Sequence, residues 1–167
     1  MAIKEKPGSK FRFAPARKKT KDFRIGIVVS EWNSKITSSL LSACEATLLE
    51  NGISRKNILV EWVPGSFELP LSAKWLLDNE TLDSVICLGC VIKGETTHNV
   101  YISEAVSLNI AALSMEYSVP VIFGVLTTEN EKQAADRAGG SKGNKGAEAA
   151  MAALKMLALS DKLCKYI

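Results

Sequence analysis

Apolar runs typical of buried strands alternate along this chain with segments of helical periodicity, and this alternation limits the fold more than any other feature. The run Ser84–Leu88 has no polar alternation, as expected of a strand buried on both faces. After it, apolar residues recur at helical spacing: Ile102, Val106, Ile110, Leu113 and Tyr117. Alternation of this kind predicts a parallel sheet with helices on both faces, connected by right-handed crossovers.

The rest of the chain repeats this pattern. The predicted strands are Phe23–Val29, Asn57–Val63, Ser84–Leu88 and Val119–Leu126. The predicted helices cover Ile36 to Leu48, a segment up to about Asn79, Ile102 to Tyr117, Glu131 to Arg137 and Ala147 to about Leu163. We therefore expect an α/β fold, a three-layer α/β/α sandwich around a flavodoxin-like, four-stranded parallel sheet of order 2-1-3-4. Without an internal repeat or a linker, residues 23–167 are predicted to form a single domain that follows a basic N-terminal arm, residues 1–22.

The composition is that of a globular protein, with 47% hydrophobic and 23% charged residues. No apolar run approaches the roughly 20 residues that span a membrane. The N-terminus lacks the apolar segment of a secretory signal. We therefore expect a cytoplasmic protein without a membrane partner.

The net charge of +3 is unevenly distributed. Met1–Asp22 contains eight Lys or Arg residues against two acidic ones, so the remaining chain has a formal charge of −3. Such an arm can bind nucleic acid. Basic tails more often lie in solvent or along a neighbouring subunit, so no nucleic-acid partner is predicted.

Cys87 and Cys90 form a C-x-x-C pattern, which occurs in redox and metal sites. Here the pattern closes a strand, in which side chains three positions apart point to opposite faces. No second C-x-x-C or partnering histidine follows at metal-site spacing. We predict two core thiols and no metal site.

Ligands of open parallel sheets bind beyond the carboxyl ends of the strands, where this chain places polar and aromatic residues. These are Trp32 and Asn33 after the first strand, Ser66, Phe67 and Glu68 after the second, Cys90 to His98 after the third, and Thr127 to Asn130 after the fourth. Trp32 can stack on a heterocycle, and Glu68 can accept hydrogen bonds from sugar-like hydroxyls. In the alternative interpretation, Trp32 is an interface residue and Glu68 complements a helix dipole. The first interpretation predicts a pocket for a flat, polar, hydroxylated molecule.

The segment after the third strand is the candidate reaction centre. Gly89 and Gly94 are expected to let its backbone turn tightly. Thr96 and Thr97 then lie at a helix start, where N–H groups and the helix dipole favour an anion such as phosphate. His98, the only histidine, lies beside them as a candidate proton carrier. The alternative is an ordinary helix cap followed by a surface histidine.

The segment Gly139–Gly146 is predicted to be a glycine-rich loop, but it lacks the residue order of a P-loop. Its Lys142 and Lys145 are candidate anion contacts.

Four longer motifs carry a family likeness: Val63–Pro70 (Val-Pro-Gly-Ser-Phe-Glu-Leu-Pro), Gly94–His98, Val121–Asn130 and Arg137–Gly146. Together they closely resemble the lumazine synthase family, and the likeness extends from about Phe23 to Leu159. The resemblance implies a transferase of riboflavin biosynthesis. It would condense 5-amino-6-ribitylamino-pyrimidinedione with 3,4-dihydroxy-2-butanone 4-phosphate, giving 6,7-dimethyl-8-ribityllumazine and phosphate, with neither a metal nor an organic cofactor.

The resemblance also implies the roles of individual residues. Trp32 would stack on the pyrimidine, and Cys90, Val91 and Ile92 would line its edge. Ser66, Phe67 and Glu68 would hold the ribityl chain, and Asn33, Phe123 and Lys145 would complete this part of the site. Glu95, Thr96 and Thr97 would bind the phosphate opposite Arg137, and His98 would transfer protons. Phe123, Arg137 and Lys145 are expected from an adjacent subunit.

Three positions depart from the family pattern. Trp32 stands where Phe is usual, Cys90 where Thr is common, and Glu95 where small residues are frequent. Trp32 keeps a stacking surface, whereas Cys90 lacks a hydroxyl. We expect the Glu95 carboxylate to point outward, because a negative charge facing the phosphate would oppose binding.

The last predicted helix indicates a homo-oligomer. It is apolar nearly all round, with Glu148 and Lys155 as its only charges before Asp161, so its second face should pack on a neighbour. The resemblance implies that the subunits form a closed ring of five, and a shell of twelve such pentamers is a further expectation.

Two other functional classes are alternatives to this enzyme. A non-catalytic flavin or phospho-sugar binding module would have no need of His98. A structural shell protein without turnover would be expected to lack part of the set His98, Arg137 and Lys145, and this chain has all three.

Overall fold

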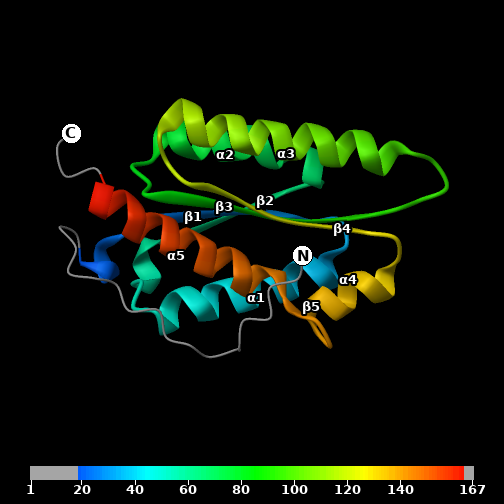
Figure 1. The fold of residues 1–167 in the computed structure, drawn as a ribbon, viewed down its shortest axis with the longest axis horizontal. Coiled ribbons are helices and arrows are strands. Elements are labelled where there is room, and N and C mark those ends of the chain that lie inside the picture. The colour runs from blue at the N-terminus through cyan, green and yellow to red at the C-terminus, as the bar shows by residue number, and fades with distance from the viewer. Residues whose placement is uncertain (1–18, 164–167) are drawn as a thin grey trace.

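The computed structural model describes residues 19–163, in which a parallel sheet lies between two layers of helices (Figure 1). The strands are β1 (Ile25–Ser30), β2 (Ile58–Val63), β3 (Ser84–Ile92) and β4 (Val121–Thr128). They form a four-stranded sheet in the order β2-β1-β3-β4, with every pair parallel. The predicted three-layer α/β/α fold and strand order are confirmed.

Two helices cover one face of the sheet and three cover the other (Figure 1). The first layer contains α2 (Leu69–Asn79) and α3 (His98–Tyr117), and the second contains α1 (Ser34–Glu50), α4 (Glu131–Arg137) and α5 (Lys145–Leu163). Short 3-10 helices occur at Thr20–Asp22 (η1), Arg55–Asn57 (η2) and Ser66–Glu68 (η3). Each face therefore has its own apolar core.

The strands divide their side chains between these two cores. Ile27 and Val29 pack with α1 and α5, whereas Val28 between them packs with α2 and α3. All six β1 residues and the first seven of β3 are buried. A central strand buried on both faces explains why these runs lack polar alternation in the sequence.

β3 extends beyond its predicted end because β4 continues beside it, pairing Ile92 with Thr128. The expectation that Gly89 turns the backbone was wrong, since this residue lies inside the strand. Neither Gly89 nor Gly94 has a positive φ. Gly89 instead allows a close approach: a Cβ atom at this position would lie 2.6 Å from the hydroxyl oxygen of Ser66.

The glycine-rich segment predicted as a loop forms a small antiparallel hairpin, β5 (Ala138–Gly140) and β6 (Gly143–Asn144). Gly139 and Gly143 have φ values of +107° and +81°, which glycine adopts at little cost. The Lys142 amide donates to the carbonyl of Asp136 over 2.9 Å. The hairpin thereby joins the end of α4 directly to the start of α5.

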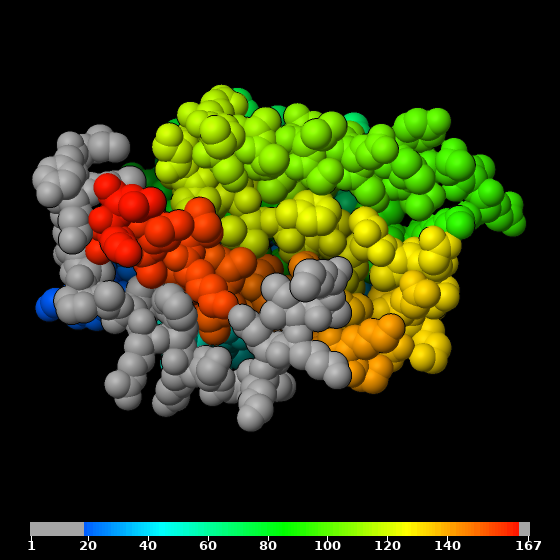
Figure 2. Space-filling model, in the orientation of Figure 1, coloured from blue at the N-terminus to red at the C-terminus, as the bar shows by residue number. Residues whose placement is uncertain are grey.

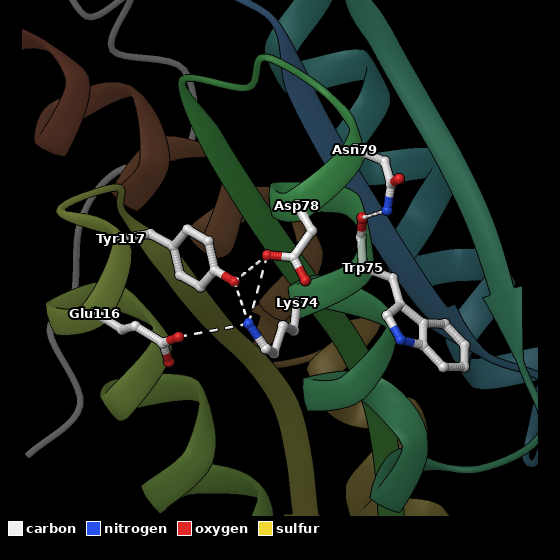
Figure 3. Close-up of polar contacts among 6 residues, drawn as sticks. All are labelled: Lys74, Trp75, Asp78, Asn79, Glu116 and Tyr117. Atoms are coloured by element: carbon white, nitrogen blue, oxygen red, sulfur yellow. Dashed lines mark hydrogen bonds and ion pairs between the residues drawn. The ribbon is translucent and has the colours of Figure 1, made fainter.

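A polar cluster connects the C-terminal halves of α2 and α3 (Figure 3). The Lys74 Nζ atom donates to the Tyr117 hydroxyl and lies 3.4 Å from both Asp78 Oδ1 and Glu116 Oε1. The Tyr117 hydroxyl donates to Asp78, which lowers the pKa of that carboxyl and raises the pKa of the tyrosine. These contacts hold the two helices together at the end away from the Thr97–His98 turn.

The predicted N-terminal arm and one cysteine lie wholly or mainly outside the described residues. Of residues 1–22, only 19–22 are described, and Cys164 lies beyond the described range. Within residues 19–163, no helix combines the length and apolar character needed to cross a membrane.

We predict that Gly146→Ala destabilises the fold, because α5 packs against α1 through the bare backbone at this point. A Cβ atom on Gly146 would collide with the carbonyl oxygen of Leu40 and lie 2.8 Å from its Cα. Overpacking of this kind costs about 1–3 kcal/mol or more. Urea denaturation followed by circular dichroism measures the loss.

Gly94→Ala is the matched control, because no atom lies within 4 Å of the added methyl position. Its stability should stay within about 0.5 kcal/mol of the parent protein. Equal denaturation midpoints for Gly146→Ala and Gly94→Ala would contradict the proposed close contact.

Candidate functional site

The turn after β1 presents Trp32 at the carboxyl edge of the sheet. The Glu31 amide donates to the carbonyl of Val63 (2.8 Å), and the Trp32 amide donates to that of Pro64 (3.1 Å). The indole lies over Gly65, where a Cβ atom would be 2.7 Å from Trp32 Cε3. Trp32 is nevertheless 64% exposed, so much of its ring surface can receive a flat ligand.

Asn33 connects this turn to β3. Its Nδ2 atom donates to the carbonyl oxygen of Cys90 over 3.0 Å. Two segments 57 positions apart in sequence are thus brought together at the expected edge.

The residues after β2 begin the next helical segment. Ser66 is buried, and its hydroxyl has no hydrogen-bond partner among the described residues. Glu68 Oε2 accepts a hydrogen bond from the Gly65 amide (2.9 Å), which gives this carboxylate a structural role at the helix start. Phe67 is exposed and lines a groove of about 320 Å³ between α2 and α3.

The C-x-x-C pattern separates its two thiols, as predicted. Cys90 packs in the core beside α1 and α5, and Cys87 packs in the core beside α2 and α3. Burial raises the pKa of Cys90 to about 11 and that of Cys87 to about 12. Neither thiol is in a disulfide, and residues 19–163 contain no group of three or more His, Cys, Asp or Glu side chains placed to hold a metal ion.

The segment from Lys93 to His98 is exposed throughout and projects at one end of the molecule (Figures 1 and 2). Thr97 is the N-cap residue of α3, but its side chain makes no capping hydrogen bond. The Thr96 hydroxyl accepts from the His98 amide at 3.4 Å. Both threonines therefore directly precede α3, as predicted, and the Glu95 side chain is exposed beside them.

Arg137 and Lys145 meet at Glu148. Arg137 Nη2 lies 3.0 Å from Glu148 Oε2, and Lys145 Nζ lies 3.7 Å from the same oxygen. Arg137 Nη1 also donates to the carbonyl of Lys142 (3.0 Å). At the hairpin between α4 and α5, Arg137 and Lys145 thus both form ion pairs with the Glu148 carboxylate.

The structure separates some of the predicted residues from others. Direct contacts connect the residues at the ends of β1, β2 and β3: Trp32, Asn33, Ser66, Glu68 and Cys90. Phe123 lies on the edge strand β4, and no side-chain hydrogen bond or ion pair within residues 19–163 joins Phe123, Arg137 or Lys145 to these connected residues.

The profile of the 6,7-dimethyl-8-ribityllumazine synthase family matches residues 22–161. The chain belongs to this family. The matched range contains all of the predicted site residues, from Trp32 to Lys145.

Named members of the lumazine synthase family are similar over most of their length. A 6,7-dimethyl-8-ribityllumazine synthase of Cytophaga hutchinsonii is 56% identical over 133 residues, covering 80% of this chain and 84% of the relative. That of Porphyromonas gingivalis is 52% identical, covering 83% and 86%. That of Bacteroides fragilis is 48% identical, covering 80% and 94%.

Sequence reasoning missed two contacts of this site. Glu148 was treated only as one charge of an apolar helix, although its position three residues after Lys145 is a spacing at which helical side chains interact. The Asn33–Cys90 hydrogen bond joins distant segments, and no local pattern indicates it.

We predict that the buried thiols resist alkylation in the folded protein. Burial raises the pKa of Cys44 to about 12 and that of Cys90 to about 11, so almost no thiolate exists at pH 8. Iodoacetamide labelling of a Cys164→Ser variant, read by mass spectrometry, should show no modification of Cys44, Cys87 or Cys90 within an hour. The same sample in urea should be labelled at all three. Rapid labelling of folded Cys90 would show that the edge of the site is open to solvent.

Proposed function

We propose that this chain catalyses the lumazine-forming step of riboflavin biosynthesis. It condenses 5-amino-6-ribitylamino-pyrimidinedione with 3,4-dihydroxy-2-butanone 4-phosphate, and 6,7-dimethyl-8-ribityllumazine and inorganic phosphate are the products. The family match across residues 22–161 is the observation that carries this assignment. The proposed compartment is the cytoplasm, where charged phosphorylated substrates are retained.

The residues at the carboxyl ends of β1, β2 and β3 would bind the pyrimidine substrate. The exposed Trp32 ring would stack on the pyrimidine, and Asn33 with the end of β3, Cys90 to Ile92, would border its edge. Ser66, Phe67 and Glu68 would hold the ribityl chain. The buried Ser66 hydroxyl lacks a partner within the described chain, so a ligand hydroxyl would satisfy it.

The segment before α3 would bind the ketone phosphate and move protons. Glu95, Thr96 and Thr97 would contribute mainly backbone N–H groups and hydroxyls at the positive end of the helix dipole. His98, the first residue of α3, would transfer protons during imine formation and phosphate loss. An amine and a ketone are already reactive, so orientation and proton transfer supply most of the acceleration, without a metal or an organic cofactor.

An adjacent subunit would complete the site with Phe123, Arg137 and Lys145. Among residues 19–163, no cationic side chain bonds to residues 94–98, and Arg137 at the end of α4 pairs with Glu148 on α5. Arg137 of the neighbouring subunit would loosen its ion pair with Glu148 and bind the substrate phosphate.

Exposed apolar side chains favour such an assembly. α3 packs on the sheet through Val106, Ile110 and Leu113, yet Leu108 and Met115 on its outer side are 70% and 82% exposed. α5 leaves Met156 and Leu159 partly exposed. A helix that is apolar both on its sheet-facing side and on its outer side usually has the outer side buried against another part of the protein or another subunit. We propose a pentameric ring, with a shell of twelve pentamers as the larger assembly.

Incubating the protein with both substrates tests the activity. The lumazine chromophore and inorganic phosphate should appear in equal amounts, above the uncatalysed rate. Formation of neither product above that rate would refute the proposed function.

We predict that His98→Ala lowers kcat while the fold survives, because an exposed side chain is removed. The usual range for a general acid–base is roughly 10²- to 10⁴-fold. The loss should lie near or below its lower end, since these substrates also condense without an enzyme. His98→Gln is the matched control, because it can form hydrogen bonds but cannot transfer a proton at neutral pH. Full turnover by both variants would exclude the proton-transfer role.

We predict that Arg137→Ala weakens binding of the phosphorylated ketone. A charge-assisted hydrogen bond contributes about 1.5–3 kcal/mol, so the KM of this substrate should rise at least tenfold. Lys132→Ala is the charge-matched control on the same helix, since among residues 19–163 Lys132 pairs only with Asp136 (3.0 Å). A change confined to the KM of the pyrimidine would show that Arg137 has another role.

Sedimentation velocity at micromolar concentration tests the assembly. Five chains of 18.1 kDa give a particle of about 90 kDa, and a shell of twelve such rings would be about twelvefold heavier. A fully active monomer would refute a site shared between subunits, whereas a stable 90-kDa particle would retain the ring and exclude the shell.

A further inference from the structure

Asn33 has a backbone conformation that few residue types adopt. Its φ and ψ angles are 60° and 42°, in the left-handed region, where Asn and Gly are favoured over other residues. Its carbonyl accepts hydrogen bonds from the amides of Ile36 and Thr37, at 2.8 and 3.1 Å, and so begins α1. Its side chain, however, makes no capping hydrogen bond.

The side chain bonds to β3 instead, beyond the point where β1 stops. β1 pairs with β3 only as far as Val29 and Leu88, whereas β3 continues beside β4 to Ile92. Asn33 Nδ2 donates to the Cys90 carbonyl, two residues after Leu88. A side-chain amide thus substitutes for the missing strand at this carbonyl.

This bond lies between two parts of the proposed pyrimidine site. Trp32 directly precedes Asn33, and its ring lies on Gly65. Cys90 begins the edge that continues through Val91 and Ile92. We propose that Asn33 is a positioning residue, which fixes the stacking ring of Trp32 relative to the Cys90–Ile92 edge. The pyrimidine as the ligand rests on the proposed function, whereas the placement of Trp32 does not.

The left-handed backbone offers a set of variants that separate the side chain from the turn. Asn33→Gly keeps the backbone conformation and removes the amide. Asn33→Asp keeps a side chain of similar shape and a similar tolerance of the left-handed backbone conformation, but it directs a carboxylate oxygen at the Cys90 carbonyl oxygen. Asn33→Ala removes the amide and also strains the backbone, so only this variant should show a clearly lowered unfolding midpoint.

Tryptophan fluorescence reports the solvent exposure and mobility of the Trp32 ring without any substrate. The chain has three tryptophans, and Trp62 on β2 and Trp75 on α2 lie outside the proposed site. A Trp62→Phe/Trp75→Phe protein therefore reports on Trp32 alone. Adding Asn33→Gly should increase acrylamide quenching of this residue and lower its anisotropy. Unchanged quenching and anisotropy in both the Gly and Asp variants would overturn the proposal.

Steady-state kinetics provide the second readout. In Asn33→Gly and Asn33→Asp, the KM of the pyrimidine should rise about two- to tenfold, the range that corresponds to one lost hydrogen bond. The KM of the phosphorylated ketone should change by less than about twofold, because its site is elsewhere. Equal increases in both KM values, or unchanged kinetics, would overturn the positioning role. If Trp32 becomes mobile but the parent protein forms no lumazine, the proposed function fails and the positioning of Trp32 stands.

Discussion

Burial of β3 on both faces is the constraint on which the rest of the structure depends. Cys87 and Cys90 on the same strand lie in different cores, so helices must cover both sides of the sheet. A parallel sheet covered in this way brings the carboxyl ends of all its strands to one edge. The positions of Trp32, Ser66 and the segment before α3 follow from that arrangement.

The predicted site residues do not all come together within one chain. Within one chain, hydrogen bonds and close packing connect Trp32, Asn33, Ser66, Glu68 and Cys90, whereas Arg137 and Lys145 are held by Glu148 beyond β4. The exposed apolar residues of α3 give a physical reason for association. A site divided between neighbours would make assembly a condition of activity and not only of stability.

Local sequence patterns predicted the layers, the strand order and the places where polar residues gather, because periodicity and chain connectivity determine these features. They failed where a residue acts through a distant contact. Gly89 was expected to form a turn, but it accommodates Ser66. The glycines after Arg137 form a hairpin, and its main-chain hydrogen bond to Asp136 cannot be inferred from a glycine-rich composition. The Asn33 hydrogen bond to Cys90 depends on where β1 ends relative to β3. The predicted roles of the site residues stay predictions.

Mixing two impaired chains tests the shared site most directly. His98→Ala and Arg137→Ala chains can be produced together in one cell in equal amounts, so that they assemble at random. If each site takes His98 from one subunit and Arg137 from its neighbour, about one quarter of the sites will contain both intact residues. With the phosphorylated ketone well below its KM, where both variants are impaired, the account predicts about one quarter of the parent activity in the mixed particles. Activity no greater than the average of the two separate variants would contradict it.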